Sequence, residues 1–139
     1  GSEPVTRLEA AQMLLPLADD QLPAPELTDT AEEAARRAAA NRFFPLEKGC
    51  FAPRRTISRQ EMATVAMQAC GVNYRNASST MPVCTDVDRV ANNYGTNAAR
   101  ALYFGFMQLE ADGHFDPERP VSRKEAVEIL DRVADFAGL

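Results

Sequence analysis

Three arginines stand at the same place in a short recurring pattern, and their chemistry suits the binding of an anion. Arg7, Arg59 and Arg123 each follow a Ser or Thr and precede a Glu by two residues. Ser or Thr followed three residues later by Glu is a capping box, which begins a helix and puts the arginine at its first position. A helix N-terminus offers backbone N–H donors to a carboxylate or phosphate, and a guanidinium adds a two-pronged donor.

The placement of these arginines is electrostatically unfavourable. A helix N-terminus carries about half a positive charge, so a cation there costs about 0.3–1 kcal/mol at an exposed site. Because all three patterns bear the arginine, we expect each one to face a nearby anion. Two sources of that anion stay open: a ligand from outside the chain, or an acidic residue of a neighbouring unit in an internal ion pair.

A longer repeat surrounds two of the three arginines. Residues 49–61 and 113–125 share Gly, Phe, Pro, Arg, Ser, Arg and Glu in register, whereas residues 5–9 repeat only the end of the pattern. A repeat of this kind indicates small units that stack on one another and share a core. Arg55 and Arg119 belong to the repeat, and we expect them to complete the anion pocket.

The elements that must position these residues are helices. The apolar spacing after each capping box predicts helices over 7–15, 59–70 and 123–137, with Pro16 ending the first. A further helix precedes two of them, over 34–40 and 98–104. The expected caps of these two helices are Thr30 and Thr96, and the expected left-handed stops are Asn41 and Gly105.

The aromatic residues divide into core and candidate ligand contacts. Phe51 and Phe115 lie in the repeated loops, where we expect them to fill the gap between two helices. Tyr94 precedes the expected cap at Thr96, and it is the aromatic side chain that we expect to be partly exposed and able to stack on a sugar ring.

The composition narrows the function. With 45% apolar and 25% charged residues in 139, the chain is that of one soluble globular domain. Its net charge of −5 does not attract nucleic acid or an anionic membrane, so an anion site must be local. No apolar run approaches the roughly 18–20 residues of a membrane span.

Other chemistry finds little support in the sequence. The three cysteines and the single histidine, His114, match no zinc spacing and no nucleophile motif, and the acidic clusters match no calcium loop. We therefore expect no metal, no cofactor and no catalytic activity. We expect Cys50, Cys70 and Cys84 to be free thiols, with a Cys70–Cys84 disulfide as the alternative.

The combined pattern resembles the S-layer homology (SLH) domain family. That family carries Gly-x-Phe-x-Pro followed by a motif of the type Ile-Thr-Arg-Ala-Glu. Its counterparts here are Gly49–Pro53 with Ile57–Glu61, and Gly113–Pro117 with Val121–Glu125. Residues 5–9 are a third, partial instance, and Thr85-Asp86-Val87 resembles the opening of such a repeat.

The resemblance implies a fold and a function. The fold would be an all-α, pseudo-threefold spindle spanning 1–139, with sub-repeats at 5–19 (partial), 27–71 and 85–138. The chain would be a secreted monomer on the bacterial cell surface that binds a wall glycan. This glycan would be a pyruvylated polysaccharide, typically with pyruvate ketals on N-acetylmannosamine, or a peptidoglycan-associated polymer. The arginine of the motif would bind the ketal carboxylate, a role that falls to Arg7, Arg59 and Arg123. The alternative is a structural or protein-interaction module built on the same repeats.

Overall fold

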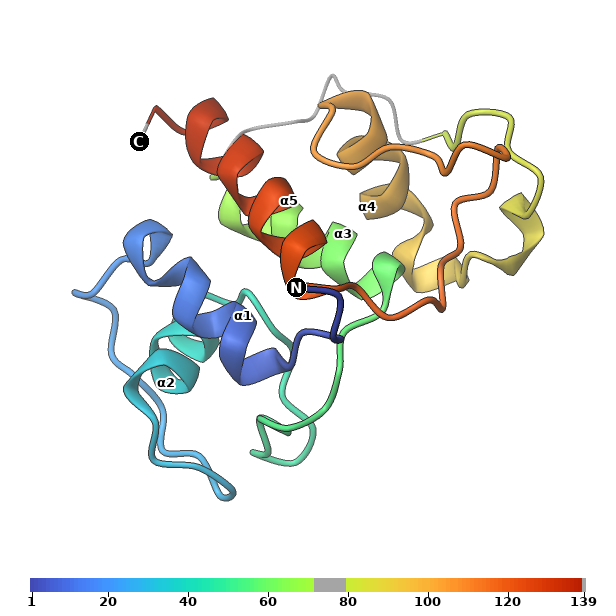
Figure 1. Ribbon diagram of the computed structural model, residues 1–139. Coiled ribbons are helices and arrows are strands. Elements are labelled where there is room, and N and C mark those ends of the chain that lie inside the picture. Colours follow the sequence, from blue (N-terminus) through green and yellow to red (C-terminus); the bar gives the residue numbers. More distant parts are fainter. Residues whose placement is uncertain (72–79, 139) are drawn as a thin grey trace.

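The protein is built from helices. The computed structural model describes residues 1–71 and 80–138 (Figure 1). In order along the chain, the elements are α1 (Arg7–Leu14), the 3₁₀ turn η1 (Leu15–Leu17), α2 (Glu33–Ala40), α3 (Arg59–Ala69), the 3₁₀ turn η2 (Val87–Arg89), α4 (Asn92–Tyr103) and α5 (Arg123–Phe136). Within the described residues, strand-like pairing is limited to four isolated bridges, so the fold is all-α, as the sequence predicts. No described helix has both the length and the apolar character that a membrane span needs.

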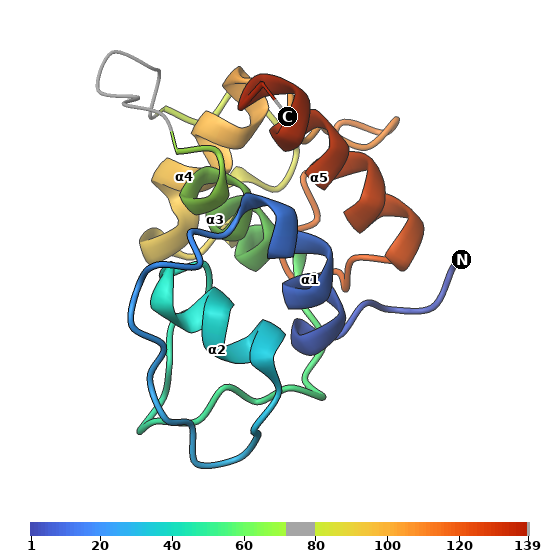
Figure 2. The same cartoon turned by 90° about the vertical axis from the view of Figure 1, so that its left-hand side faces the viewer.

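Four of the helices pack as two pairs, and α5 lies against both pairs. α1 packs on α2, α4 packs on α3, and α5 contacts both α1 and α3 (Figures 1 and 2). The buried apolar side chains form one continuous cluster that draws on all five helices. Phe51 and Phe115 are completely buried in it, which confirms their predicted place in the core. The units therefore share a core.

The three predicted caps begin helices at the expected residues, although only those of α1 and α3 form the complete, reciprocal capping box. The side chains of Thr6, Ser58 and Ser122 accept the N–H of the Glu three residues later. α1 ends at Leu14, and Pro16 lies in the 3₁₀ turn that follows, as predicted. Local capping chemistry was sufficient to predict these starts because each cap is satisfied within four residues.

The predicted caps of the other two helices are wrong. α2 begins at Glu33 after Glu32, and Thr30 instead accepts the N–H of Glu32 in a local turn. α4 begins four residues before Thr96, at Asn92. Its cap residue, Ala91, donates its N–H to Gln60 Oε1 on α3. A contact between elements thus sets this helix start, which short-range sequence reasoning does not detect.

The helix stops reveal a one-residue difference between the two repeats. Gly105 has the predicted left-handed backbone, with φ +77°. Asn41 has φ −86°, and the left-handed residue is Arg42, with φ +60°. The stop is therefore Arg42 rather than Asn41. Left-handed backbone costs a residue with a Cβ about 1–2 kcal/mol, so this Arg is in a strained conformation.

The two Gly-x-Phe-x-Pro loops are 64 positions apart, but this spacing does not extend back into the helices that precede them. The Phe43 N–H donates to the Ala38 carbonyl, as the Phe106 N–H donates to that of Ala101. These pairs are 63 positions apart, so the later loop carries one additional residue between Glu110 and Gly113.

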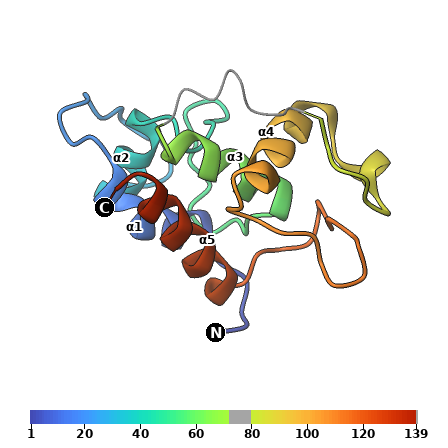
Figure 3. The same ribbon diagram turned by 90° about the horizontal axis from the view of Figure 1, so that it is seen from above.

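In both repeats, an aspartate holds the Gly-x-Phe-x-Pro loop. The Asp29 carboxylate accepts the N–H groups of Phe51 and Ala52, at 2.9 and 2.8 Å. Asp86, which is 5% exposed, accepts those of Phe115 and Asp116 in the same way. The segment that contains η2 and the loop before α5 lie on the side of the molecule away from α1 and α2 (Figure 3).

Candidate anion-binding site

The starts of α1, α3 and α5 are joined in what we call the hydrogen-bond ring. The Arg7 N–H donates to the Arg55 carbonyl at 2.8 Å, and the Arg59 N–H donates to the Arg119 carbonyl at 3.0 Å. The Arg123 N–H donates to the Glu3 carbonyl at 3.0 Å, which closes the ring. The start of α1 is thus hydrogen-bonded to the loop that precedes α3, and the start of α3 to the loop that precedes α5. The start of α5 is hydrogen-bonded to the N-terminal segment.

Because of this ring, the backbone N–H groups at the helix N-termini are not available to bind an anion. The first four N–H groups of α1 all have acceptors: two carbonyls in residues 53–55 and two oxygens of Thr6. The same groups of α3 and α5 are satisfied in the same way. The expectation that backbone donors would point out to a ligand is therefore wrong, and any anion binding falls to side chains.

Arg59 is used inside the molecule. It is 3% exposed, and its Nε and Nη2 donate to the carbonyls of Phe115 and Gln108, at 2.5 and 2.6 Å. Its Nη1 lies 2.5 Å from Oε2 of Glu125. The adjacent Arg59 hollow, about 150 Å³, is lined by three glutamates and two arginines, so its lining does not favour an anion: Glu110, Glu125, Glu128, Arg59 and Arg132.

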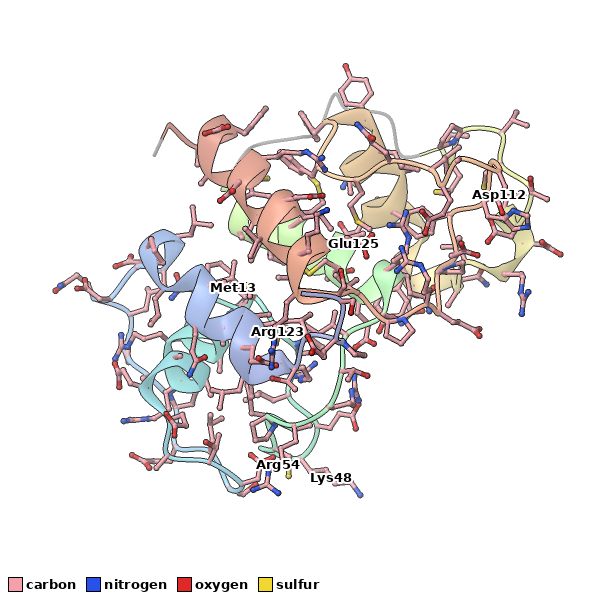
Figure 4. The ribbon with its side chains drawn as sticks, viewed as in Figure 1. Met13, Lys48, Arg54, Asp112, Arg123 and Glu125 are labelled. Carbon is pink, nitrogen blue, oxygen red and sulfur yellow. The ribbon has the colours of Figure 1, made fainter. Side chains whose placement is uncertain are left out.

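Arg119 and Arg123 also have carboxylate partners. Arg119 pairs with Glu110 at 2.5 Å and with Glu125 at 3.1 Å. Arg123 lies on the surface at the start of α5, with its side chain 46% exposed, and pairs with Glu9 of α1 at 2.5 Å (Figure 4). For these two residues and Arg59, the structure realises the internal ion pairs that the sequence left as an alternative.

Arg7 differs from the other two motif arginines. It is 3% exposed, and its Nε and Nη2 donate to the carbonyls of Phe51 and Pro45, at 2.6 and 2.8 Å. The rings of Phe44 and Phe51 lie 4.9 and 5.1 Å from its guanidinium carbon. Within residues 1–71 and 80–138, no carboxylate forms an ion pair with Arg7, and its Nη1 makes no hydrogen bond. Burial, and secondly the nearby Arg55, lower the pKa of Arg7, which is the mark of an under-compensated cation.

The hollow beside Arg7 is cationic. This Arg7 hollow measures about 290 Å³ and lies against the loop before α3. Three cations and one acid line it, together with four uncharged residues: Arg7, Lys48, Arg55, Glu47, Pro45, Cys50, Phe51 and Ala52. Lys48 extends outward from this loop (Figure 4). The surplus of positive charge and the larger volume distinguish the Arg7 hollow from the Arg59 hollow.

The cap glutamates explain this difference. Glu61 keeps its back-bond to the capping residue, because its Oε1 accepts the N–H and the hydroxyl of Ser58. Its Oε2 goes to Arg55 at 2.7 Å, an interaction that raises the pKa of Arg55. Glu125 makes no such back-bond to Ser122, so its carboxylate is available to Arg59. Because Glu61 stays in the capping box of α3, Arg7 lacks the carboxylate partner that Glu125 provides to Arg59.

The remaining predicted contact is Tyr94. It is half-buried on α4 and packs against the apolar core. It does not line the Arg7 hollow. The structure thus brings together Arg7 and Arg55 of the expected residues, and adds Lys48. Lys48 lies directly before the repeated Gly-x-Phe-x-Pro, outside the repeated residues, and this is why the repeat did not identify it.

In the part of the chain that the structure describes, the cysteine and acidic side chains form no disulfide and no metal site. Cys50, Cys70 and Cys84 are free thiols, so the alternative disulfide is not formed. Among the described residues, no group of three or more Cys, His, Asp or Glu side chains is arranged to hold a metal ion.

Comparisons with known proteins agree with the sequence patterns. Residues 85–127 match the family model of the S-layer homology domain. The solved undecaheme cytochrome from the S-layer of Carboxydothermus ferrireducens has a similar fold, with a TM-score of 0.61 and 16% sequence identity. The match covers 99% of this chain but only 18% of that chain. A search of curated proteins found no match. Residues 85–127 of this chain are therefore similar to S-layer homology domains, which are cell-wall-binding modules.

Proposed function

We propose that this chain anchors a bacterial surface protein to the cell wall by binding an acidic wall saccharide, with one carboxylate of the saccharide held in the Arg7 hollow. The family resemblance supports a pyruvate ketal on N-acetylmannosamine as the acidic group. A single observation carries the proposal: Arg7 is a buried guanidinium whose Nη1 makes no hydrogen bond within the described residues, in a hollow that holds more cations than acids.

The energetics favour a bound carboxylate at this point. A buried charge without a partner is costly, and a ligand carboxylate would offset that cost. A hydrogen bond to a charged group contributes about 1.5–3 kcal/mol, which corresponds to roughly ten- to hundredfold in Kd. Lys48 and Arg55 would add weaker, partly solvated attraction. Phe51, whose carbonyl fixes the Arg7 guanidinium, keeps the donor in place before the ligand arrives.

The proposal assigns one working groove rather than three. Arg59 and Arg123, each paired with a glutamate at 2.5 Å, would take structural roles. Arg55 pairs with Glu47 and Glu61 but lines the Arg7 hollow, and it would be a ligand contact. Arg119, which pairs with Glu110 and Glu125, would take a structural role. Tyr94, which lies outside the Arg7 hollow, would not contact the ligand there. The hydrogen-bond ring supports a pseudo-threefold arrangement of three repeats spanning residues 1–139, and we propose that the chain acts as a monomer on the cell surface.

Titration calorimetry with purified pyruvylated wall polysaccharide tests the proposal. Arg7→Lys keeps the charge but loses the two-pronged donor, and it should weaken binding at least about tenfold. Because Arg7 is buried, a second variant at the rim is needed. Lys48→Asn removes a charge from an exposed residue with φ +54°, where Asn is tolerated. It should weaken binding about three- to tenfold without changing the melting temperature.

The controls separate this proposal from its alternative. Lys124→Gln removes an equal charge from the exposed start of α5 and should bind like the parent chain. Polysaccharide stripped of pyruvyl groups by mild acid should bind poorly. Equal binding of the stripped and intact polysaccharides, or unchanged binding by both Arg7→Lys and Lys48→Asn, would contradict the proposal. The internal ion pairs of Arg59 and Arg123 would then favour a structural or protein-interaction module.

A further inference from the structure

A second hollow adjoins the Arg7 hollow. This Arg42 hollow measures about 400 Å³ and lies between the end of α2, the loop that follows, and α3. Its polar lining comes from Arg42, Thr64 and Gln68, and its apolar lining comes mainly from Phe44, Pro45 and Leu46. A cation, two hydrogen-bonding side chains and an apolar wall are the features that a charged sugar ring requires.

Pro45 joins the two hollows. It lines both of them, and its carbonyl accepts a hydrogen bond of 2.8 Å from Nη2 of Arg7. The guanidinium of Arg7 is therefore hydrogen-bonded to the residue that lines both hollows. A chain-like ligand with one unit at Arg7 would have its next unit directed across Pro45.

The backbone at Arg42 indicates that this side chain is not there to serve the fold. Arg42 has φ +60°, a conformation that glycine adopts without strain. Gly105 holds the corresponding place in the other repeat, with φ +77°. A Cβ at Gly105 would meet no atom within 4 Å, so the helix stop itself requires no side chain. Arg42 is exposed, and in the described part of the chain it forms no ion pair.

We infer that the two hollows form one groove that binds two successive acidic units of a wall saccharide, with Arg7 meeting the first carboxylate and Arg42 the second. The inference rests on the proposed function of the Arg7 hollow. Leu46 and Phe44 would contact the apolar face of the second sugar, and Gln68 would bond to its hydroxyl groups. The strain at Arg42 is then a cost of placing a cation beside the second unit.

Two ligands of different length test this inference by calorimetry. One is the pyruvylated N-acetylmannosamine monosaccharide, and the other is an oligosaccharide with two pyruvylated units. Arg42→Gly should weaken binding of the two-unit ligand about tenfold and leave binding of the monosaccharide within about twofold of the parent chain. Its melting temperature should rise because the backbone strain is relieved. Arg42→Lys, which keeps the charge, should retain most of the affinity for the two-unit ligand.

The outcomes distinguish this inference from the proposed function. Arg7→Lys should weaken both ligands, and if it weakens neither, both proposals fail. If Arg7→Lys weakens both ligands while Arg42→Gly weakens neither, only the second subsite is wrong. An equal effect of Arg42→Gly on both ligands would also overturn the second subsite, because the cation would then act on the first unit.

Discussion

Nη1 of Arg59 lies 2.5 Å from Oε2 of Glu125, a residue on the helix of the following repeat. The pair is largely buried, because the two side chains are 3% and 21% exposed. Arg7 holds the equivalent position one repeat earlier and reaches no carboxylate in the described part of the chain. One repeat thus uses its arginine for cohesion, and the other leaves it available.

Glu125→Gln should destabilise the protein. The amide keeps the size of the side chain and its place in the first turn of α5, but it removes the closest negative charge from the buried Arg59 and leaves only Glu110, at 3.9 Å. We expect the free energy of unfolding to fall by about 1–3 kcal/mol, measured by urea denaturation. Glu128→Gln is the matched control, since Glu128 lines the same hollow but is exposed and should change stability little. Equal stabilities of the two variants would show that the ion pair contributes nothing.

Asp86→Asn should loosen the loop of the third repeat. The carboxylate accepts two N–H groups, one on each oxygen, and an amide would set its own N–H₂ against one of them. We expect a loss of about 1–3 kcal/mol in thermal unfolding, because a buried donor would lose its acceptor. A similar melting temperature in the parent chain and Asp86→Asn would rule out this role.

The loop aspartates also predict how stability depends on pH. Backbone N–H groups of Phe51 and Ala52 hold the pKa of Asp29 below its usual 3.8. Burial acts to raise the pKa of Asp86, but the N–H groups of Phe115 and Asp116 outweigh it, so this pKa is also lowered. A lowered folded-state pKa gives stability that is complete above the unfolded value and is lost as the pH falls through the folded value.

We therefore expect the melting temperature of the parent chain to fall as the pH is lowered from about 5 to 3. Asp29→Asn removes one of the responsible carboxylates and should flatten this slope. An unchanged slope in that variant would assign the acid sensitivity to other groups. Glu9, whose pKa is lowered mainly by the N–H of Thr6, is the next candidate.

Binding should weaken with salt, but only moderately. Lys48 and Arg55 are exposed enough for ions to screen them, whereas Arg7 is buried and screened much less. Calorimetry between 50 and 500 mM NaCl should show Kd rising by about tenfold or less. In Lys48→Asn, the salt dependence should be shallower than in the parent chain. A salt dependence that Lys48→Asn leaves unchanged would remove Lys48 from the site.

The sequence was most informative where structure depends on near neighbours. The caps at Thr6, Ser58 and Ser122 are satisfied within four residues, and the short motif was sufficient to predict them. The start of α4 depends instead on Gln60, which lies about thirty residues away in the chain. Thr96 was a reasonable cap by local rules, but the tertiary contact determined the helix start.

The candidate site shows a similar limit. The sequence identified the arginines, but it could not show for each one whether its anion is an external ligand or an acidic residue of a neighbouring unit. That decision depends on whether a cap glutamate keeps its back-bond, as Glu61 does, or turns away, as Glu125 does. The two glutamates occupy identical places in the repeat, so only the three-dimensional packing around them distinguishes the two cases.

The hydrogen-bond ring has a consequence for how the molecule comes apart. In an open solenoid, terminal repeats can fray while the middle stays folded, because each repeat contacts only its neighbours. Here the start of α5 is held by Glu3, so the last helix is attached to the beginning of the chain and no unit is terminal. Melting of any one unit would release the other two, and the protein should unfold in a single concerted step despite its repetitive sequence.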